Sequence, residues 1–197
     1  MSQKQEFRTL EMPVEVRTNE DENKNYIVGY ALKFNSESEN LGGFVEKIDP
    51  RALESADISD VRALFNHSAD KVLGRTKSGT LKLEVDEIGL RYTIEPPNTT
   101  FANDLMESMS RGDINQSSFG FVIDYDNEGD NWNYDESRDV YLRTINKFRK
   151  ITDVSVVTYP AYQATESVVA KRSLDEFKSK VHNELKRKQI DIELELI

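Results

Sequence analysis

The chain has 197 residues and carries 26 lysine and arginine residues against 36 aspartate and glutamate residues, a formal net charge of −10. This balance disfavours a protein that binds nucleic acid or an anionic membrane, and the absence of cysteine excludes disulfides, thiolate zinc sites and cysteine nucleophiles. The N-terminus lacks the apolar core of a signal peptide and no segment has the ~18 apolar residues of a membrane helix, so we expect a soluble, cytosolic protein.

In the first half of the chain, apolar residues alternate in short segments, which is the period of strands with one buried face. Residues 26–34 predict such a strand, and residues 5–18 are expected to pair back on it as a hairpin. Asp49 and Pro50 predict the cap and the first position of a short helix. Further strands are predicted at residues 60–67, 80–85 and 89–95, of which the last two form a second hairpin.

In the second half, residues 98–111 predict a helix that ends at Gly112. Its apolar stripe consists of Phe101, Leu105, Met106 and Met109. Three more strands are predicted at residues 117–125, 139–145 and 151–159. Many short strands with a few helices predict an α+β fold, mainly β, built as a barrel or sandwich of mixed type.

After residue 171 the pattern changes, and we divide the chain into a domain over residues 1–171 and a tail over residues 172–197. Apolar residues at three- and four-residue steps over 174–185 predict an amphipathic helix. The alternation in IDIELELI, residues 190–197, predicts a strand. The tail either docks on the domain or is a detachable segment that binds a partner, and both alternatives stay open.

Two segments have the outline of ligand-binding loops without the required residues. Residues 74–79 resemble a phosphate loop, but Thr80 stands where the lysine is needed, so we interpret the segment as a tight turn. Residues 124–135 resemble a calcium loop, but Asp135 replaces the bidentate glutamate and the flanks predict strands. We therefore expect a solvated acidic loop over residues 124–139, no metal site, and no cofactor.

Three polar residues at the ends or within apolar strands are candidates for chemistry. His67 ends the apolar segment ALFNH, and imidazole is well suited to exchange a proton near neutral pH. Ser118 lies on the same strand face as Gly120, which leaves room for a backbone to approach. Asp153 begins a valine-rich strand, where a carboxylate needs a partner such as an imidazole N–H. For each of these three residues, the alternative is a purely structural role in the fold.

Five motifs in order resemble the prohead proteases of tailed bacteriophages. The motifs are VRALFNH (61–67), GRTKSGTL (74–81), RGDI (111–114), SFGF (118–121) and DVSVVTYPAY (153–162). The upstream segments GYA (29–31) and GGFVEKI (42–48) are also similar to that family, and the resemblance covers residues 26–165.

The resemblance implies a serine endopeptidase with the fold of herpesvirus assembly proteases, a small β-barrel flanked by helices. His67, Ser118 and Asp153 match the family's histidine, serine and third triad residue. Such an enzyme acts in the cytoplasm of the bacterial host, inside the procapsid, where it cleaves the scaffold segment from the major capsid protein and also cleaves itself. The herpesvirus relatives imply activation by dimerisation, and no partner among nucleic acids or membranes is expected.

Several alternatives remain open on the sequence. Ser117 stands where the family has an apolar residue, so it competes with Ser118, and Asp113 is a second candidate for the third residue. Backbone N–H groups near Gly112 or Gly74, with Arg111 or Arg75, are candidates for stabilising an oxyanion. A catalytically silent assembly protein on the same fold is the rival function. A carboxylate-based hydrolase is a weaker rival, because the sequence offers no buried acidic pair for it. Titration of activity would separate the two, since a histidine base predicts loss of activity below about pH 6–7.

Overall fold

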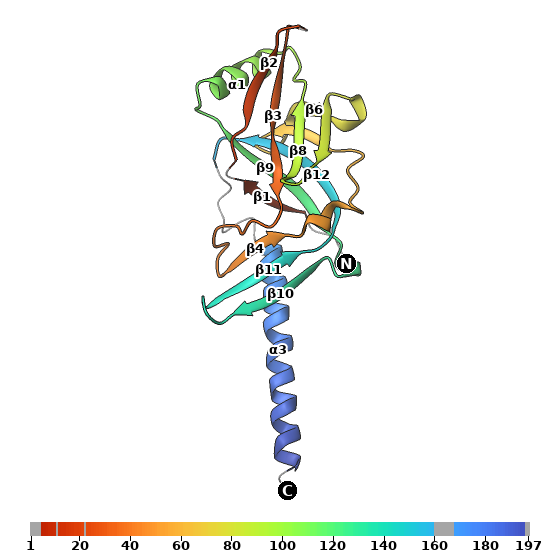
Figure 1. Ribbon diagram of the computed structural model, residues 1–197, viewed down its shortest axis with the longest axis vertical. Coiled ribbons are helices and arrows are strands. Elements are labelled where there is room, and N and C mark those ends of the chain that lie inside the picture. Colours follow the sequence, from red (N-terminus) through yellow and green to blue (C-terminus); the bar gives the residue numbers. More distant parts are fainter. Residues whose placement is uncertain (1–4, 11, 22, 160–167, 196–197) are drawn as a thin grey trace.

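The computed structural model describes residues 5–10, 12–21, 23–159 and 168–195, which are mainly β (Figure 1). The strands are β1 (Glu6–Leu10), β2 (Glu15–Asn19), β3 (Lys24–Lys33), β4 (Phe44–Ile48), β5 (Arg62–Phe65), β6 (Ser68–Arg75), β7 (Leu81–Val85), β8 (Gly89–Ile94), β9 (Gln116–Ile123), β10 (Asp130–Asp135), β11 (Val140–Ile145) and β12 (Phe148–Val157). The α-helices in these residues are α1 (Thr100–Ser110) and α3 (Val168–Glu195). The predicted α+β class, mainly β, is confirmed.

The strands form three sheets, and none of them closes on itself in the described part of the chain. The first has the order β1-β9-β12-β5-β6, the second β2-β3-β8-β7 and the third β10-β11-β4. The barrel expected from the herpesvirus proteases is therefore not confirmed. Most strand pairs are antiparallel, but β12 pairs in parallel with β5, and β11 pairs in parallel with β4.

The main core lies between the first two sheets, because alternate side chains of their strands face one another. Phe119 and Phe121 of β9 stack with ring centroids 4.9 Å apart, and Phe148 of β12 meets Phe121 edge-on at 5.1 Å. From the second sheet, Leu32 and Tyr92 are almost fully buried in the same core. These large side chains fix one face of β9, so the residues between them point to the other face.

The predicted hairpin of residues 5–18 on residues 26–34 is wrong in its first half. Of the two strands in residues 5–18, only β2 pairs with β3, with Glu15 opposite Val28. β1 instead pairs antiparallel with β9 in another sheet, with Arg8 opposite Phe119. Pro13 lies between β1 and β2, and since proline donates no backbone hydrogen bond it interrupts the ladder there.

The predicted short helices lie where the sequence places them. Pro50–Leu53 forms a 3₁₀-helix, and the Asp49 carboxylate accepts a hydrogen bond of 2.9 Å from the Arg51 N–H. At α1, the Thr99 hydroxyl accepts from the Ala102 N–H, and the helix ends before Gly112, whose φ is +82°. Neither α1 nor α3 is both long and apolar enough to cross a membrane.

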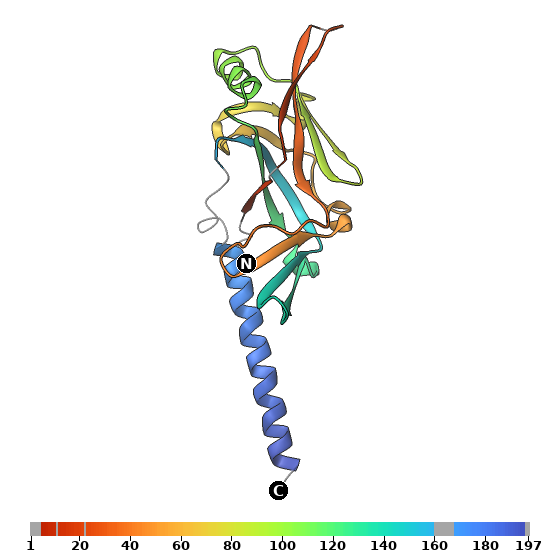
Figure 2. The ribbon, with the colours of Figure 1, turned by 60° about the vertical axis from the view of Figure 1, so that its left-hand side comes forward.

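Helix α3 has a docked beginning and an exposed continuation (Figures 1 and 2). Its first turns pack on the third sheet, where Ala170 and Leu174 contact Phe44 and Trp132. The Trp132 indole N–H donates a hydrogen bond of 2.9 Å to the Ser173 hydroxyl. From residue 178 to residue 189 the helix is exposed, and both views show it extending away from the sheets.

The strand predicted at the C-terminus is wrong, because α3 continues through residue 195. The alternation does not itself predict a helix, because residues two positions apart lie about 200° apart around a helix axis. A helix satisfies its backbone hydrogen bonds internally, whereas a strand needs a neighbouring strand for them.

The two segments that resemble ligand-binding loops have structural roles. Residues 76–78 form a 3₁₀ turn that ends at Gly79, whose φ is +75°, which agrees with the predicted tight turn. The acidic segment is only partly a solvated loop: Trp132 of β10 is buried, and Asp130 is ion-paired with Arg143 at 2.8 Å.

Candidate active site

Strand β9 separates the two neighbouring serines onto opposite faces. Ser117 points into the core, where its hydroxyl forms a hydrogen bond of 3.1 Å with the Tyr92 hydroxyl. Burial raises the pKa of Tyr92, and the hydrogen bond from Ser117 opposes that shift in part. Ser118 points to the other face, on which Gly120 also lies, as the alternation predicted.

A tight turn between β5 and β6 presents His67. Asn66 and His67 both have positive φ values, 52° and 54°, which is the requirement of a two-residue type I′ hairpin turn. Asn66 binds this turn to Thr158, the residue directly after β12. Its side-chain amide donates to the Thr158 hydroxyl at 3.1 Å and its side-chain oxygen accepts from the Thr158 N–H at 2.9 Å. The imidazole is therefore fixed above the sheet that contains β9 and β12.

Asp153 completes a continuous chain of hydrogen bonds. On β12 it lies opposite Gly120 of β9. The His67 Nδ1 atom is 2.5 Å from the Asp153 Oδ1 atom, and the His67 Nε2 atom is 2.7 Å from the Ser118 Oγ atom. The three residues that the sequence singles out are thus brought together from three strands or turns.

Further donors surround the Asp153 carboxylate. The Ser155 hydroxyl donates to Oδ1 at 2.9 Å, and the Thr152 hydroxyl donates to Oδ2 at 3.1 Å. The Gln5 side-chain amide also donates to Oδ2, at 3.2 Å. Sequence reasoning missed all three donors. Ser155 could have been found, since it stands two residues after Asp153 and therefore on the same face of β12.

The site is covered in this structure. Ser118 has no exposed surface, while the side chains of Asp153 and His67 retain 6% and 17% exposure. The Ser118 hydroxyl donates a hydrogen bond of 2.9 Å to the backbone carbonyl of Arg8 on β1. The Phe7 ring lies against the imidazole with ring centroids 4.4 Å apart. The N-terminal strand β1 provides this cover, whereas the sequence analysis paired that segment with residues 26–34.

The other candidates have different partners. Asp113 pairs with Arg111 at 3.1 Å, and both side chains are more than half exposed. Arg75 pairs with Asp60 at 2.7 Å. Gly74 packs against the Thr80 backbone, which leaves no room for a side chain there.

A hydroxyl, an imidazole and a carboxylate linked in this order can carry out nucleophilic catalysis. The carboxylate fixes one tautomer, so that Nδ1–H donates to Asp153 and Nε2 can accept the proton of Ser118. The Ser118 oxygen would then attack a carbonyl carbon. The arrangement is that of an acyl-transfer site.

Comparisons with known proteins point in the same direction. Residues 12–180 match the model of a protein family described as caudovirus prohead serine protease. Among solved structures, the chain is similar to the bacteriophage T4 capsid assembly protease gp21, with a TM-score of 0.54 and 12% identity. That match covers 81% of this chain and 100% of the other, and at this identity it shows a shared fold alone. A comparison with curated protein sequences finds no match.

Proposed function

Since this chain belongs to the caudovirus prohead serine protease family and is a serine protease, we propose that it cleaves the coat protein or its scaffold segment inside an immature phage capsid. The family description, which names the prohead, supports this proposed site of action. We also propose that the enzyme cleaves its own chain. The net charge of −10 suits an enzyme enclosed in a shell that later fills with DNA, because it disfavours retention on phosphate.

The proposed nucleophile is Ser118, the proposed general base is His67, and Asp153 orients the imidazole. The single observation that carries this assignment is the unbroken chain of hydrogen bonds, 2.7 Å from serine to histidine and 2.5 Å from histidine to aspartate. Ser117 is the weaker candidate, because its hydroxyl faces the core and bonds to Tyr92.

The mechanism follows from these positions. His67 takes the proton of Ser118 as its oxygen attacks the scissile carbonyl carbon, and the resulting imidazolium protonates the leaving amine. A water molecule then repeats the cycle on the acyl-enzyme and releases the acid product. Asp153 stays ionised throughout and stabilises the imidazolium.

The test is the intact mass of the wild-type, Ser118→Ala and Ser117→Ala proteins, each purified alone and after co-expression with the coat protein of the same phage. We expect fragments with the wild type and none with Ser118→Ala, since loss of the nucleophile lowers kcat by about 10⁴–10⁶ in such triads.

Ser117→Ala is the matched control. It should keep its cleavage activity and lose about 1–3 kcal/mol of stability, because the buried Tyr92 hydroxyl loses its partner. If Ser117→Ala is inactive while Ser118→Ala cleaves, the two serines have been assigned in the wrong order. Intact coat protein with every variant, in particles that assemble normally, would instead favour a silent assembly protein.

A further inference from the structure

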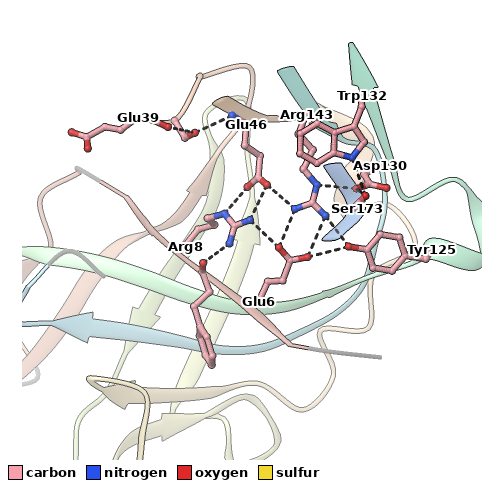
Figure 3. Close-up of polar contacts among 11 residues, drawn as sticks. Glu6, Arg8, Glu39, Glu46, Tyr125, Asp130, Trp132, Arg143 and Ser173 are labelled. Carbon is pink, nitrogen blue, oxygen red and sulfur yellow. Dashed lines mark hydrogen bonds and ion pairs between the residues drawn. The ribbon is translucent and has the colours of Figure 1, made fainter. Parts of the chain in front are cut away.

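One buried polar atom beside the proposed nucleophile has no hydrogen-bond partner. Elsewhere even buried charged side chains bind one another, at 2.8–3.2 Å in the group of Glu6, Arg8, Glu46 and Arg143 (Figure 3). Among the buried side-chain nitrogen and oxygen atoms of the described residues, the exception is Oε1 of Gln116. Burying an oxygen without a partner costs free energy, so this position calls for an explanation.

Gln116 lies on the catalytic face of the sheet. It begins β9 and stands two residues before Ser118, so both side chains point to the same face. On β12 it lies opposite Val157, whose side chain has no polar group to bind the amide. The unpaired amide oxygen therefore belongs to a side chain that is the next neighbour of the proposed nucleophile along this face.

The other directions around the Ser118 hydroxyl are already occupied. The His67 Nε2 atom lies 2.7 Å away, and the Arg8 carbonyl oxygen lies 2.9 Å away on the side of β1. Further along β9, the Asp153 carboxylate fills the space on this face. A carbonyl oxygen and a carboxylate both repel a negative oxygen. In the described part of the chain, the direction that remains leads to Gln116.

The usual donors to an oxyanion, which are backbone N–H groups next to the nucleophile, are engaged elsewhere. Ser118 lies within β9, between β1 and β12, so the N–H groups around it serve the ladders with these two strands. The side-chain donors near the triad already bind the Asp153 carboxylate, namely Gln5, Thr152 and Ser155. An oxyanion formed at Ser118 therefore needs a different donor.

A glutamine amide can place a donor where its unpaired oxygen now lies. The oxygen and nitrogen of the amide are nearly equal in size, so a half-turn about the last side-chain bond exchanges them. The N–H at this position finds an acceptor only when a negative oxygen forms beside it. A hydrogen bond that is made in the transition state and not before is the kind that accelerates a reaction.

We propose that the side-chain amide of Gln116 donates the hydrogen bond that stabilises the oxyanion, an inference that rests on the proposed function for the nucleophile. As the Ser118 oxygen bonds to the carbonyl carbon, its proton passes to His67 and an electron pair of the C=O bond moves to the oxygen. That oxygen accepts the Gln116 N–H. When the pair returns, the C–N bond breaks and the amine leaves with the proton from His67.

The first test is Gln116→Met, which keeps the size of the side chain and removes both polar atoms of the amide. The substrate is a synthetic peptide that spans the cut site located by intact mass. We expect kcat to fall about 10²–10³-fold, as for other oxyanion donors, with KM unchanged. The unfolding temperature should stay the same or rise, because the variant no longer buries an unpaired oxygen.

The matched control is Gln189→Met, the same exchange at an exposed position of α3, which should keep the wild-type kcat and KM. A purely structural role for Gln116 predicts that activity and unfolding temperature fall together. That result, a wild-type kcat for Gln116→Met, or a rise in KM alone would each overturn the inference.

The second test compares two inhibitors made on the sequence of the same peptide. A trifluoromethyl ketone forms an ionised hemiketal with Ser118 and so presents an oxyanion, whereas the corresponding alcohol binds without forming one. Gln116→Met should weaken binding of the ketone by about the factor lost in kcat and leave binding of the alcohol unchanged. An equal change for both inhibitors, or no change for the ketone, would reject Gln116 as the donor.

These measurements separate the inference from the proposed function. If the wild type cleaves, Ser118→Ala does not, and Gln116→Met keeps the wild-type kcat, the proposed function stands and the donor is wrong. If the purified wild type cleaves neither the coat protein nor the peptide, the proposed function fails and this inference fails with it.

Discussion

Gly120 is the residue on which the packing of the triad depends. It lies directly opposite Asp153 in the pairing of β9 with β12. A Cβ atom at this position would overlap the Asp153 carboxylate and would also meet the side chains of Gln5 and Thr152. The sequence suggested that this glycine makes room for a backbone. The structure shows that the room is taken by the side chain of the acid.

We predict that Gly120→Ala lowers kcat strongly with little change in the fold. The added methyl group must push the Asp153 carboxylate away from His67, and misorientation of the imidazole in such triads costs up to about 10⁴ in kcat. Coat-protein cleavage rates measure the effect, and circular dichroism checks the fold. Gly43→Ala is a control for the added methyl group, because no atom lies within 4 Å of its Cβ position, although its φ of +111° adds local strain. Wild-type activity of Gly120→Ala would show that Asp153 does not need its present position.

The three residues of the proposed triad could be predicted from the sequence, and the residues that contact them could not. His67, Ser118 and Asp153 stand in short motifs whose order is characteristic of a family. Gln5 and Phe7 carry no such signal, because their role depends on which strand β1 pairs with. Strand pairing between residues more than 100 positions apart is a tertiary property that local periodicity does not determine.

At the scale of elements, the attachment of β1 depends on ionised carboxylates. Burial by itself would raise the pKa of Glu6, but the attraction of Arg143, followed by that of Arg8, outweighs it and leaves the pKa below its usual value. A folded-state pKa below the unfolded value stabilises the fold above the unfolded pKa of about 4.3. That stabilisation is lost as the pH falls through the lower, folded-state pKa.

We predict that Glu6→Gln lowers the free energy of unfolding by about 3–5 kcal/mol at pH 7, since it removes one of the buried carboxylates that pair with Arg8 and Arg143. The difference from the wild type should stay constant down to about pH 5 and shrink below about pH 4. Urea unfolding between pH 7 and pH 3 measures it. Glu15→Gln removes an exposed pair with Arg17 and should cost less than about 1 kcal/mol at any pH. A difference that grows on acidification would contradict the assigned pKa direction.

The sequence predicted the local elements of the fold better than it predicted which strands pair with one another. The strand 26–34, the hairpin of residues 80–95 and helix α1 each carry their own periodicity and capping residues. The arrangement of β10, β11 and β4 in a separate sheet carries no local signal, since β4 and β11 pair across about 100 residues of chain. At the C-terminus, the alternation of residues 190–195 predicted a strand, but the helix that precedes them continues through residue 195.

At the scale of the whole molecule, α3 divides into a part that the third sheet needs and a part that it does not. We predict that a chain ending at Lys178 unfolds at nearly the wild-type temperature, because Ala170, Leu174 and Phe177 keep their contacts. Removing α3 altogether should cost roughly 3 kcal/mol or more, the burial of two large apolar side chains. The unfolding temperatures of the two truncated chains test both expectations. Equal loss in both would mean that the exposed part of the helix is also bound.

The exposed part of α3 also governs how the molecule moves through solution. At 1.5 Å per residue, residues 178–195 extend about 27 Å, roughly the diameter of a small domain. Such a rod raises translational friction and slows tumbling about the short axes. A monomer of this shape elutes from a sizing column ahead of a sphere of equal mass, so early elution alone does not identify a dimer. Sedimentation equilibrium, which depends on mass and not on shape, separates the two.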